Sequence, residues 1–303
     1  MGYLQPSDLQ DATVQYLSPW GTQGVDFSQY TAAQLQSLIT RASRQIDGYC
    51  KQTFALTNAQ ERYMGRGTNT LRLRRYPLAQ IPASVFGGAG VLSQSLVVNT
   101  TTTTANGKGD TVVSVADTSN IVAGQYLQWN DNAGENGIAI AGASVPSGPG
   151  TITLTSALQS AHASGAQVIV NTVDYVQIVL PGQSFFPIPI QQLVVDAEKG
   201  LLINYTPLMF QNLGYATIFP RELPLLVRYT YGYLLGQIPG VLQEVCLEQC
   251  RRIVLRSGHL GAGGVRQWRL DDQSVSYADW KPVPLDPDLQ EALGPFRRTV
   301  GMI

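Results

Sequence analysis

Cys246 and Cys250 are the pair best placed for metal chemistry in this sequence. They lie four positions apart, so one face of a helix would carry both thiols. His259 is the only candidate for a third ligand nearby, and it lies beyond the end of the expected helix. Both cysteines also fit a buried apolar stripe, and free cysteine is among the most buried residue types. The sequence therefore favours core packing, and we expect no metal and no cofactor.

The glycine-rich segment 258–264 resembles a phosphate-binding loop only superficially. Phosphate loops run from a strand through the glycines into a helix, whose N–H groups face the anion. Here the glycines follow an expected helix and precede an expected strand, and no lysine of the P-loop type is present. The pattern favours a helix cap and hinge over a nucleotide site.

A hydrolytic triad needs a histidine, and the chain has only His162 and His259. Neither is accompanied by a G-x-S-x-G motif. Asp271 and Asp272 are a pair of carboxylates, but adjacent residues of an extended chain point to opposite faces and do not converge. We therefore expect that the protein is not an enzyme.

Seven arginines are candidates for contacts with an anionic partner. Two alternate along an expected strand, three lie on the polar side of a late helix, and two flank Trp268. Binding of phosphate is one interpretation, and pairing with acidic residues of a neighbouring subunit is the other. Acidic residues are about as numerous as arginines in the same segments, which favours subunit pairing. The seven are Arg72, Arg74, Arg251, Arg252, Arg256, Arg266 and Arg269.

The composition is that of a folded protein with an unusually weak charge. The 303 residues carry a net charge of −1, and charged residues make up 14% where about 25% is usual. Glutamine, with 27 copies, partly fills the gap. This excludes disorder, a disulfide scaffold and a histone-like protein, and argues against a nucleic-acid binder that depends on bulk charge. A weakly charged surface meets little repulsion when it packs against copies of itself.

The first residues of the sequence given lack the basic and apolar regions of a signal peptide, and the uncharged stretch 200–220 is interrupted by asparagines and a proline. The three cysteines give no even disulfide framework. We expect a chain that folds in a cytoplasm and has no membrane partner.

The distribution of charge predicts an inserted module. No arginine lies between Arg75 and Arg221, and residues 93–172 hold only five charged residues. The same range is rich in threonine, serine, alanine, glycine and valine. We predict a core in two parts, 1–92 and 173–303, around an inserted β domain at 93–172.

Helical spacing is clearest over 31–52, which Thr31 can cap, and over 239–257, which Pro239 can start. A further helix is expected from Pro287. Short strands are expected over 70–74, around Val85 and at several places between 175 and 233, and strands alone over 93–172. The predicted fold class is α+β: a helical core with long N-terminal and penultimate helices plus short antiparallel strands. An all-β sandwich or barrel-like domain is inserted in it.

A series of short motifs follows in a fixed order along the chain: Tyr30-Thr31, Ala42-Ser43, Ile46-Asp47, Tyr49-Cys50, Tyr76-Pro77-Leu78, Gly200-Leu201-Leu202, Phe219-Pro220, the strand Val227–Tyr233, Ile238-Pro239 and Val275-Ser276-Tyr277. Their order and spacing resemble the head–tail connector (adaptor) proteins of tailed bacteriophages. The resemblance covers roughly residues 28–90 and 173–300, and the insert separately resembles small β modules of phage virion proteins.

This resemblance implies a structural virion protein at the neck, made in the host cytoplasm. Copies of the chain, usually twelve, would form a ring below the portal protein and contact tail or neck proteins below. DNA would pass through the channel during genome packaging and ejection without sequence recognition. The C-terminal segment would reach the portal, with Leu289, Leu293 and Phe296 as docking candidates.

The alternative is a tail or virion-surface protein whose β insert contacts the host or a decoration partner. An exposed aromatic cluster in the insert would favour it. The aromatic side chains available there are Tyr126 and Trp129, and both also fit a buried strand.

Overall fold

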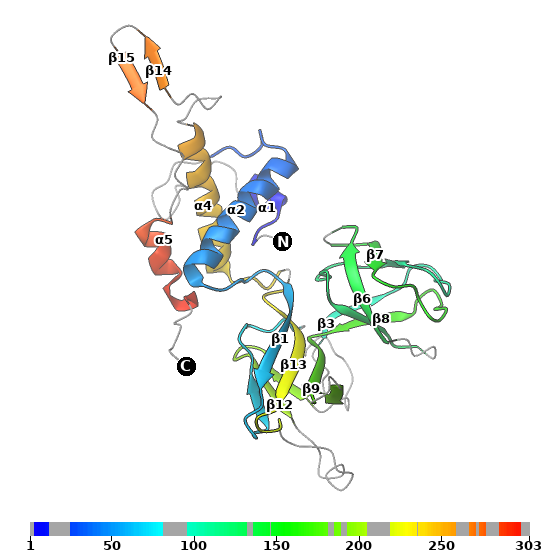
Figure 1. The fold of residues 1–303 in the computed structure, drawn as a ribbon. Coiled ribbons are helices and arrows are strands. Elements are labelled where there is room, and N and C mark those ends of the chain that lie inside the picture. Colours follow the sequence, from blue (N-terminus) through cyan, green and yellow to red (C-terminus); the bar gives the residue numbers. More distant parts are fainter. Residues whose placement is uncertain are drawn as a thin grey trace. The chain divides into compact units, whose positions relative to one another are not determined.

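The computed structural model describes residues 3–11, 25–80, 96–131, 136–145, 147–180, 185–188, 193–204, 219–234, 236–258, 267–270, 273–276 and 285–297. The chain divides into two compact units. Unit 1 consists of residues 1–54 and 238–303, and unit 2 of residues 55–237 (Figure 1). The three-range division at 92 and 172 stays a prediction.

Unit 1 contains the helices. They are α1 (Pro6–Asp11), α2 (Ala32–Cys50), α4 (Gly240–Gly258), α5 (Pro287–Ala292) and the 3-10 helix η3 (Gly294–Phe296). A two-stranded antiparallel hairpin, β14 (Gln267–Leu270) and β15 (Gln273–Ser276), completes the described part of the unit.

Helix α2 begins and ends where its sequence predicts. The Gln34 N–H donates to the Thr31 hydroxyl and the Thr31 N–H donates to the Gln34 side-chain oxygen, so a capping box satisfies two free donors. Lys51 ends the helix in the left-handed conformation, with φ of 56°. The buried face contains most of the expected apolar stripe together with one polar residue, Ser43: Leu35, Ile39, Ala42, Ser43, Ile46 and Cys50.

Helices α2 and α4 pack side by side within unit 1 (Figure 1). Small and polar side chains lie between them: the Ser43 hydroxyl is 3.8 Å from the Cys246 thiol, and the Gln249 amide donates to Gln45 at 2.6 Å. Cys246 and Cys250 face this core and are fully buried. The two helices thus cover each other's apolar stripes.

Two antiparallel sheets form the part of unit 2 outside the barrel. The larger has the order β1 (Thr57–Met64), β13 (Pro224–Tyr231), β9 (Val173–Val179) and β10 (Phe185–Ile188). The smaller has the order β11 (Leu193–Asp196), β12 (Leu201–Asn204) and β2 (Thr70–Arg72). A shared core lies against both, with Tyr63, Leu71, Val176, Leu202, Phe219, Val227 and Tyr229 among its members.

The remaining strands of unit 2 form a six-stranded sheet in the order β3-β8-β5-β6-β7-β4. These are β3 (Leu96–Thr101), β4 (Val112–Val115), β5 (Tyr126–Trp129), β6 (Asn136–Ala143), β7 (Gly150–Leu154) and β8 (Gln167–Asn171).

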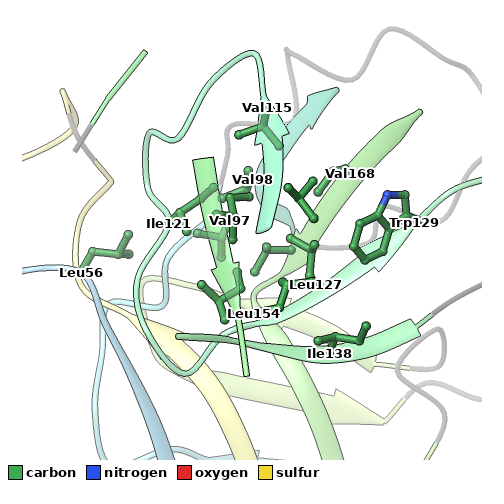
Figure 2. Packing of buried hydrophobic residues seen from close by; sticks show 14 of the residues in the cluster. Leu56, Val97, Val98, Val115, Ile121, Leu127, Trp129, Ile138, Leu154 and Val168 are labelled. Atoms are coloured by element: carbon green, nitrogen blue, oxygen red, sulfur yellow. The ribbon is translucent and has the colours of Figure 1, made fainter. Parts of the chain in front are cut away.

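The six-stranded sheet closes on itself as a barrel. The two outer strands meet beyond β3, where Thr102 pairs with Val115 and the Ala116 N–H donates to the Thr101 carbonyl at 2.9 Å. Inward-facing aliphatic side chains fill the interior, with Trp129 at one side (Figure 2). The range expected to be an all-β insert therefore contains only strands and loops where it is described.

The predicted fold class is wrong about the core. The described residues are mostly β, and the four α-helices are short, the longest having 19 residues. Two helices lie where their spacing predicts, but the described strands of unit 2 outside the barrel form two sheets of their own. Strand β1 explains part of the error, because Tyr63 is its only buried residue and its sequence lacks the apolar alternation of a half-buried strand.

Candidate functional site

The outer edge of β10 exposes two adjacent aromatic side chains. Phe185 is 54% exposed and Phe186 is 57% exposed, on opposite faces of the strand. The strand pairs with β9 on one side, and no described strand pairs with its other side. Exposed aromatic side chains beside unpaired backbone groups are typical of a protein–protein contact.

The opposite edge of the same sheet also carries an exposed apolar side chain. Strand β1 pairs only with β13 among the described strands, and Met64 at its end is 58% exposed. We call the outer sides of β1 and β10, with Met64, Phe185 and Phe186, the sheet edges. The sequence analysis missed them, because β1 was not predicted and the prolines around Phe185 and Phe186 concealed a strand.

A buried ionic cluster ties the barrel to the four-stranded sheet inside unit 2. Asp174 of β9 accepts a hydrogen bond from the Asn58 amide at 2.8 Å and lies 3.7 Å from the Arg228 guanidinium. The guanidinium of Arg228 stacks 4.6 Å from the ring of Tyr126, which lies in strand β5 of the barrel. The backbone N–H of Tyr126 donates to Asp174. Burial outweighs these favourable contacts and raises the pKa of Asp174 to about 7.

A second cluster, of tyrosines around one carboxylate, lies on the other face of that sheet. The Tyr229 hydroxyl donates to Glu61 at 2.8 Å, the Tyr63 hydroxyl donates to the same oxygen, and Arg75 lies 3.1 Å from the other. Burial and the bond to Glu61 raise the pKa of Tyr63 to about 12. Arg75 also donates to Tyr231 at 2.6 Å. All these polar groups satisfy one another and stabilise the sheet.

The predicted arginines are not brought together. Arg72 and Arg74 lie in unit 2, exposed, with their guanidinium groups 5.9 Å from the Tyr76 ring and 5.1 Å from the Tyr63 ring. Neither forms an ion pair with a described carboxylate. Stacking orients these guanidinium groups and leaves their N–H groups available to an anionic partner.

The arginines of α4 are used within unit 1. Arg252 lies 2.9 Å from Glu248 one turn earlier and also pairs with Asp286 next to α5. Arg251 is buried and lies 3.8 Å from Glu248. The side chain of Arg256, all of Arg266 and the side chain of Arg269 lie outside the described residues. For Arg251 and Arg252, then, the acidic partner that the sequence analysis sought in a neighbouring subunit lies in the same chain.

The portal-docking candidates face inward in unit 1. Leu289 and Leu293 are fully buried, and Phe296 contacts Phe54 edge to face with ring centres 5.9 Å apart. Their docking role stays a prediction, but these side chains already stabilise the chain's own fold. Apart from Pro287, the exposed residues of α5 are acidic, Asp288 and Glu291.

The remaining candidates for chemistry, the cysteine pair of α4 and His162, contribute to packing where the structure describes them. The pKa of the Cys250 thiol is raised by its contact with Cys246 and by burial, which opposes a reactive thiolate. His162 is buried, stacks on Trp129 at 4.3 Å and contacts Asp131 at 2.7 Å. Residues 259–264, including His259, and the Asp271–Asp272 pair lie outside the described residues. Among the residues described, no group of three or more potential metal ligands converges.

The two aromatic side chains of the insert, Tyr126 and Trp129, do not form an exposed cluster. Trp129 is 3% exposed in the barrel core, and Tyr126 packs against Tyr175 and beneath Arg228.

No protein-family model matches the chain, and no curated protein matches it in sequence. None of the described helices is long and apolar enough to cross a membrane.

Proposed function

We propose that the chain is a structural virion subunit, the head-to-tail adaptor of a tailed bacteriophage. Copies of it form a ring below the portal protein, join the capsid to the tail and continue the DNA channel. The observation that carries the proposal is the pair of exposed aromatics on β10, Phe185 and Phe186, at the open edge of a sheet. Large apolar side chains at an open edge are costly in water and are used when a neighbour covers them.

The polar clusters support the same proposal. Asp174 with Arg228, Glu61 with Arg75, and Glu248 with Arg252 all stabilise the fold, so these charges are committed to structure. The weak charge of the chain suits a subunit that packs against copies of itself. The finer assignment, to the neck, rests on the resemblance of motif order to connector proteins.

Electron microscopy of lysates tests this function directly. A phage whose copy of this gene carries an early stop codon should yield heads and separate tails that fail to join. Expression of the full chain from a plasmid should restore joined particles. Intact virions that no longer adsorb to the host would overturn the adaptor function and place the protein at the tail or surface.

A further inference from the structure

The four strands of the larger sheet alternate strictly in direction, because every pairing between them is antiparallel. The two edge strands, β1 and β10, therefore run in opposite directions. A second copy placed beside the first in the same orientation would bring its β1 antiparallel to the β10 of the first. The sheet could then continue from copy to copy without a change of pattern.

The hydrogen-bonding phase of the two edges also matches. The Gly65 N–H donates to the Leu223 carbonyl of the neighbouring chain segment at 3.0 Å. The N–H and C=O groups of successive strand residues point alternately to the two sides of the strand. The backbone groups of Tyr63 therefore point toward β13, and those of Met64 point outward. Pro187 has no N–H to donate to β9. As a proline of an edge strand, it lies at a position whose backbone groups point away from β9. Phe185, two residues earlier, faces outward with it.

The register of the sheet aligns the exposed apolar side chains. One row across the sheet runs Tyr63, Leu225, Ile178, Phe186. In the adjacent row, Met64 pairs with Pro224 at one edge and Phe185 pairs with Val179 at the other. A straight continuation of the sheet would place Phe185 directly opposite Met64 of the next copy and on the same face.

From these three relations we propose that the β10 edge of one copy pairs with the β1 edge of the next, with Phe185 opposite Met64. The proposal rests on the proposed function in that copies of the chain assemble. Phe185 and Met64 exchange two backbone hydrogen bonds, and the Pro187 carbonyl accepts a third from the N–H of Arg62. The apolar contact is a sulfur–aromatic pair, and Phe186 extends over Tyr63 on the other face.

This contact joins unlike edges, so it repeats from copy to copy, and it forms a ring when the rotation from each copy to the next returns to the first copy. The competing arrangement pairs two β10 strands about a twofold axis. There Pro187 would lie opposite Phe185 in both positions, and only two backbone bonds would form. It would also stop at a dimer.

Thiol cross-linking of the full chain tests the pairing. Paired strands hold their Cα atoms within reach of a disulfide, and the native cysteines Cys50, Cys246 and Cys250 are buried. The variant with both Met64→Cys and Phe185→Cys should give a ladder of covalent multimers, in neck complexes from virions and in the concentrated purified chain. Neither single substitution should give a ladder. If that double variant gives no ladder, a dimer from the variant with both Phe185→Cys and Pro187→Cys would overturn the pairing in favour of the twofold arrangement.

A charge exchange provides a second test. Lysine at both positions, through Met64→Lys with Phe185→Lys, should lower the ring fraction about tenfold, because like charges oppose each other across the contact. Met64→Glu with Phe185→Lys should restore it. Val112→Lys, at an exposed valine of the barrel, is the matched control and should leave it unchanged.

The two proposals fail in different ways. Joined virions that contain the protein at the neck, with no cross-link between the two introduced thiols, would overturn the edge pairing and leave the adaptor function standing. A multimer ladder from the purified chain, with the protein absent from the neck, would overturn the adaptor function and leave the edge pairing standing.

Discussion

The carboxylate of Asp174 lies 3.7 Å from the guanidinium of Arg228, at the point where the barrel meets the four-stranded sheet. Despite this partner, burial raises the pKa of the carboxyl to about 7 from an ordinary value of 3.8. The folded protein therefore holds a proton that the unfolded chain releases between these two pH values. Relative to the unfolded chain, the folded state is therefore most stable when Asp174 is protonated.

The first prediction concerns this pH dependence. The contribution of Asp174 to stability is fully present below about pH 4, and it falls as the pH rises toward 7, by up to about 1.4 kcal/mol per pH unit. Asp174→Asn should remove this part of the slope. Urea unfolding between pH 4.5 and 7.5 measures it. Asp47 in unit 1, whose pKa burial also raises to about 7, contributes in the same direction, so Asp174→Asn should keep the part of the slope that Asp47 causes, and the variant with both Asp174→Asn and Asp47→Asn should lose both parts. A wild-type slope in Asp174→Asn would contradict the assignment.

The second prediction concerns the contact of α4 with α5. Arg252→Met leaves the buried carboxylate of Glu248 without its closest cation and removes the pair with Asp286. Loss of one partner from a buried pair costs about 3–5 kcal/mol, and the 11% exposure of Arg252 puts the loss near the lower end. The free energy of unfolding measures it. Arg72→Met, at an exposed arginine, should cost less than about 1 kcal/mol. Equal losses in both variants would show that the contact does not stabilise unit 1.

The third prediction concerns the start of α2. Thr31→Ala removes the acceptor for the Gln34 N–H and should cost about 1 kcal/mol, whereas Thr31→Ser keeps the acceptor and should cost little. Thermal unfolding distinguishes the two variants. If Ser and Ala destabilise equally, the capping bond contributes nothing.

The fourth prediction concerns the portal. Because Leu289 and Leu293 are buried, Leu289→Ala should destabilise unit 1 by about 2–5 kcal/mol rather than act on docking alone. The exposed acidic residues of α5 are better probes of a surface contact. Asp288→Lys with Glu291→Lys should lower the unfolding temperature only slightly, because Asp288 lies in the first turn of α5, and should reduce co-sedimentation with purified portal protein. Unchanged co-sedimentation of that variant would exclude this face of α5 from the contact.

Local patterns predicted helices α2, α4 and α5 and the barrel strands other than β3. Thr31 and Pro239 mark helix starts, and Ser, Gly and Asn separate the apolar runs of 96–171. The sheets outside the barrel depend on pairings such as Gln60 with Arg228, which no local period reveals. The same holds for the ionic cluster, whose members Asn58, Asp174 and Arg228 are far apart in the chain. Each looks like an ordinary polar residue until the fold brings them together.

The proposed contact surface was hidden for a different reason. Phe185 and Phe186 precede a proline, and a short strand with a proline is weak as a sequence signal. Their exposure depends on β10 being the last strand of its sheet, which is a property of the strand order and not of the residues themselves.

The first and last strands of the barrel are register partners, with Leu96 opposite Asn171. The chain thus enters and leaves the barrel at one point, directly before β9 begins at Val173. Because the two ends of the barrel lie next to each other, a tight turn could replace it without altering the strand order of the four-stranded sheet that contains β9. The same site could accept a foreign domain, although the contacts of Tyr126 with Asp174 and Arg228 would then be lost.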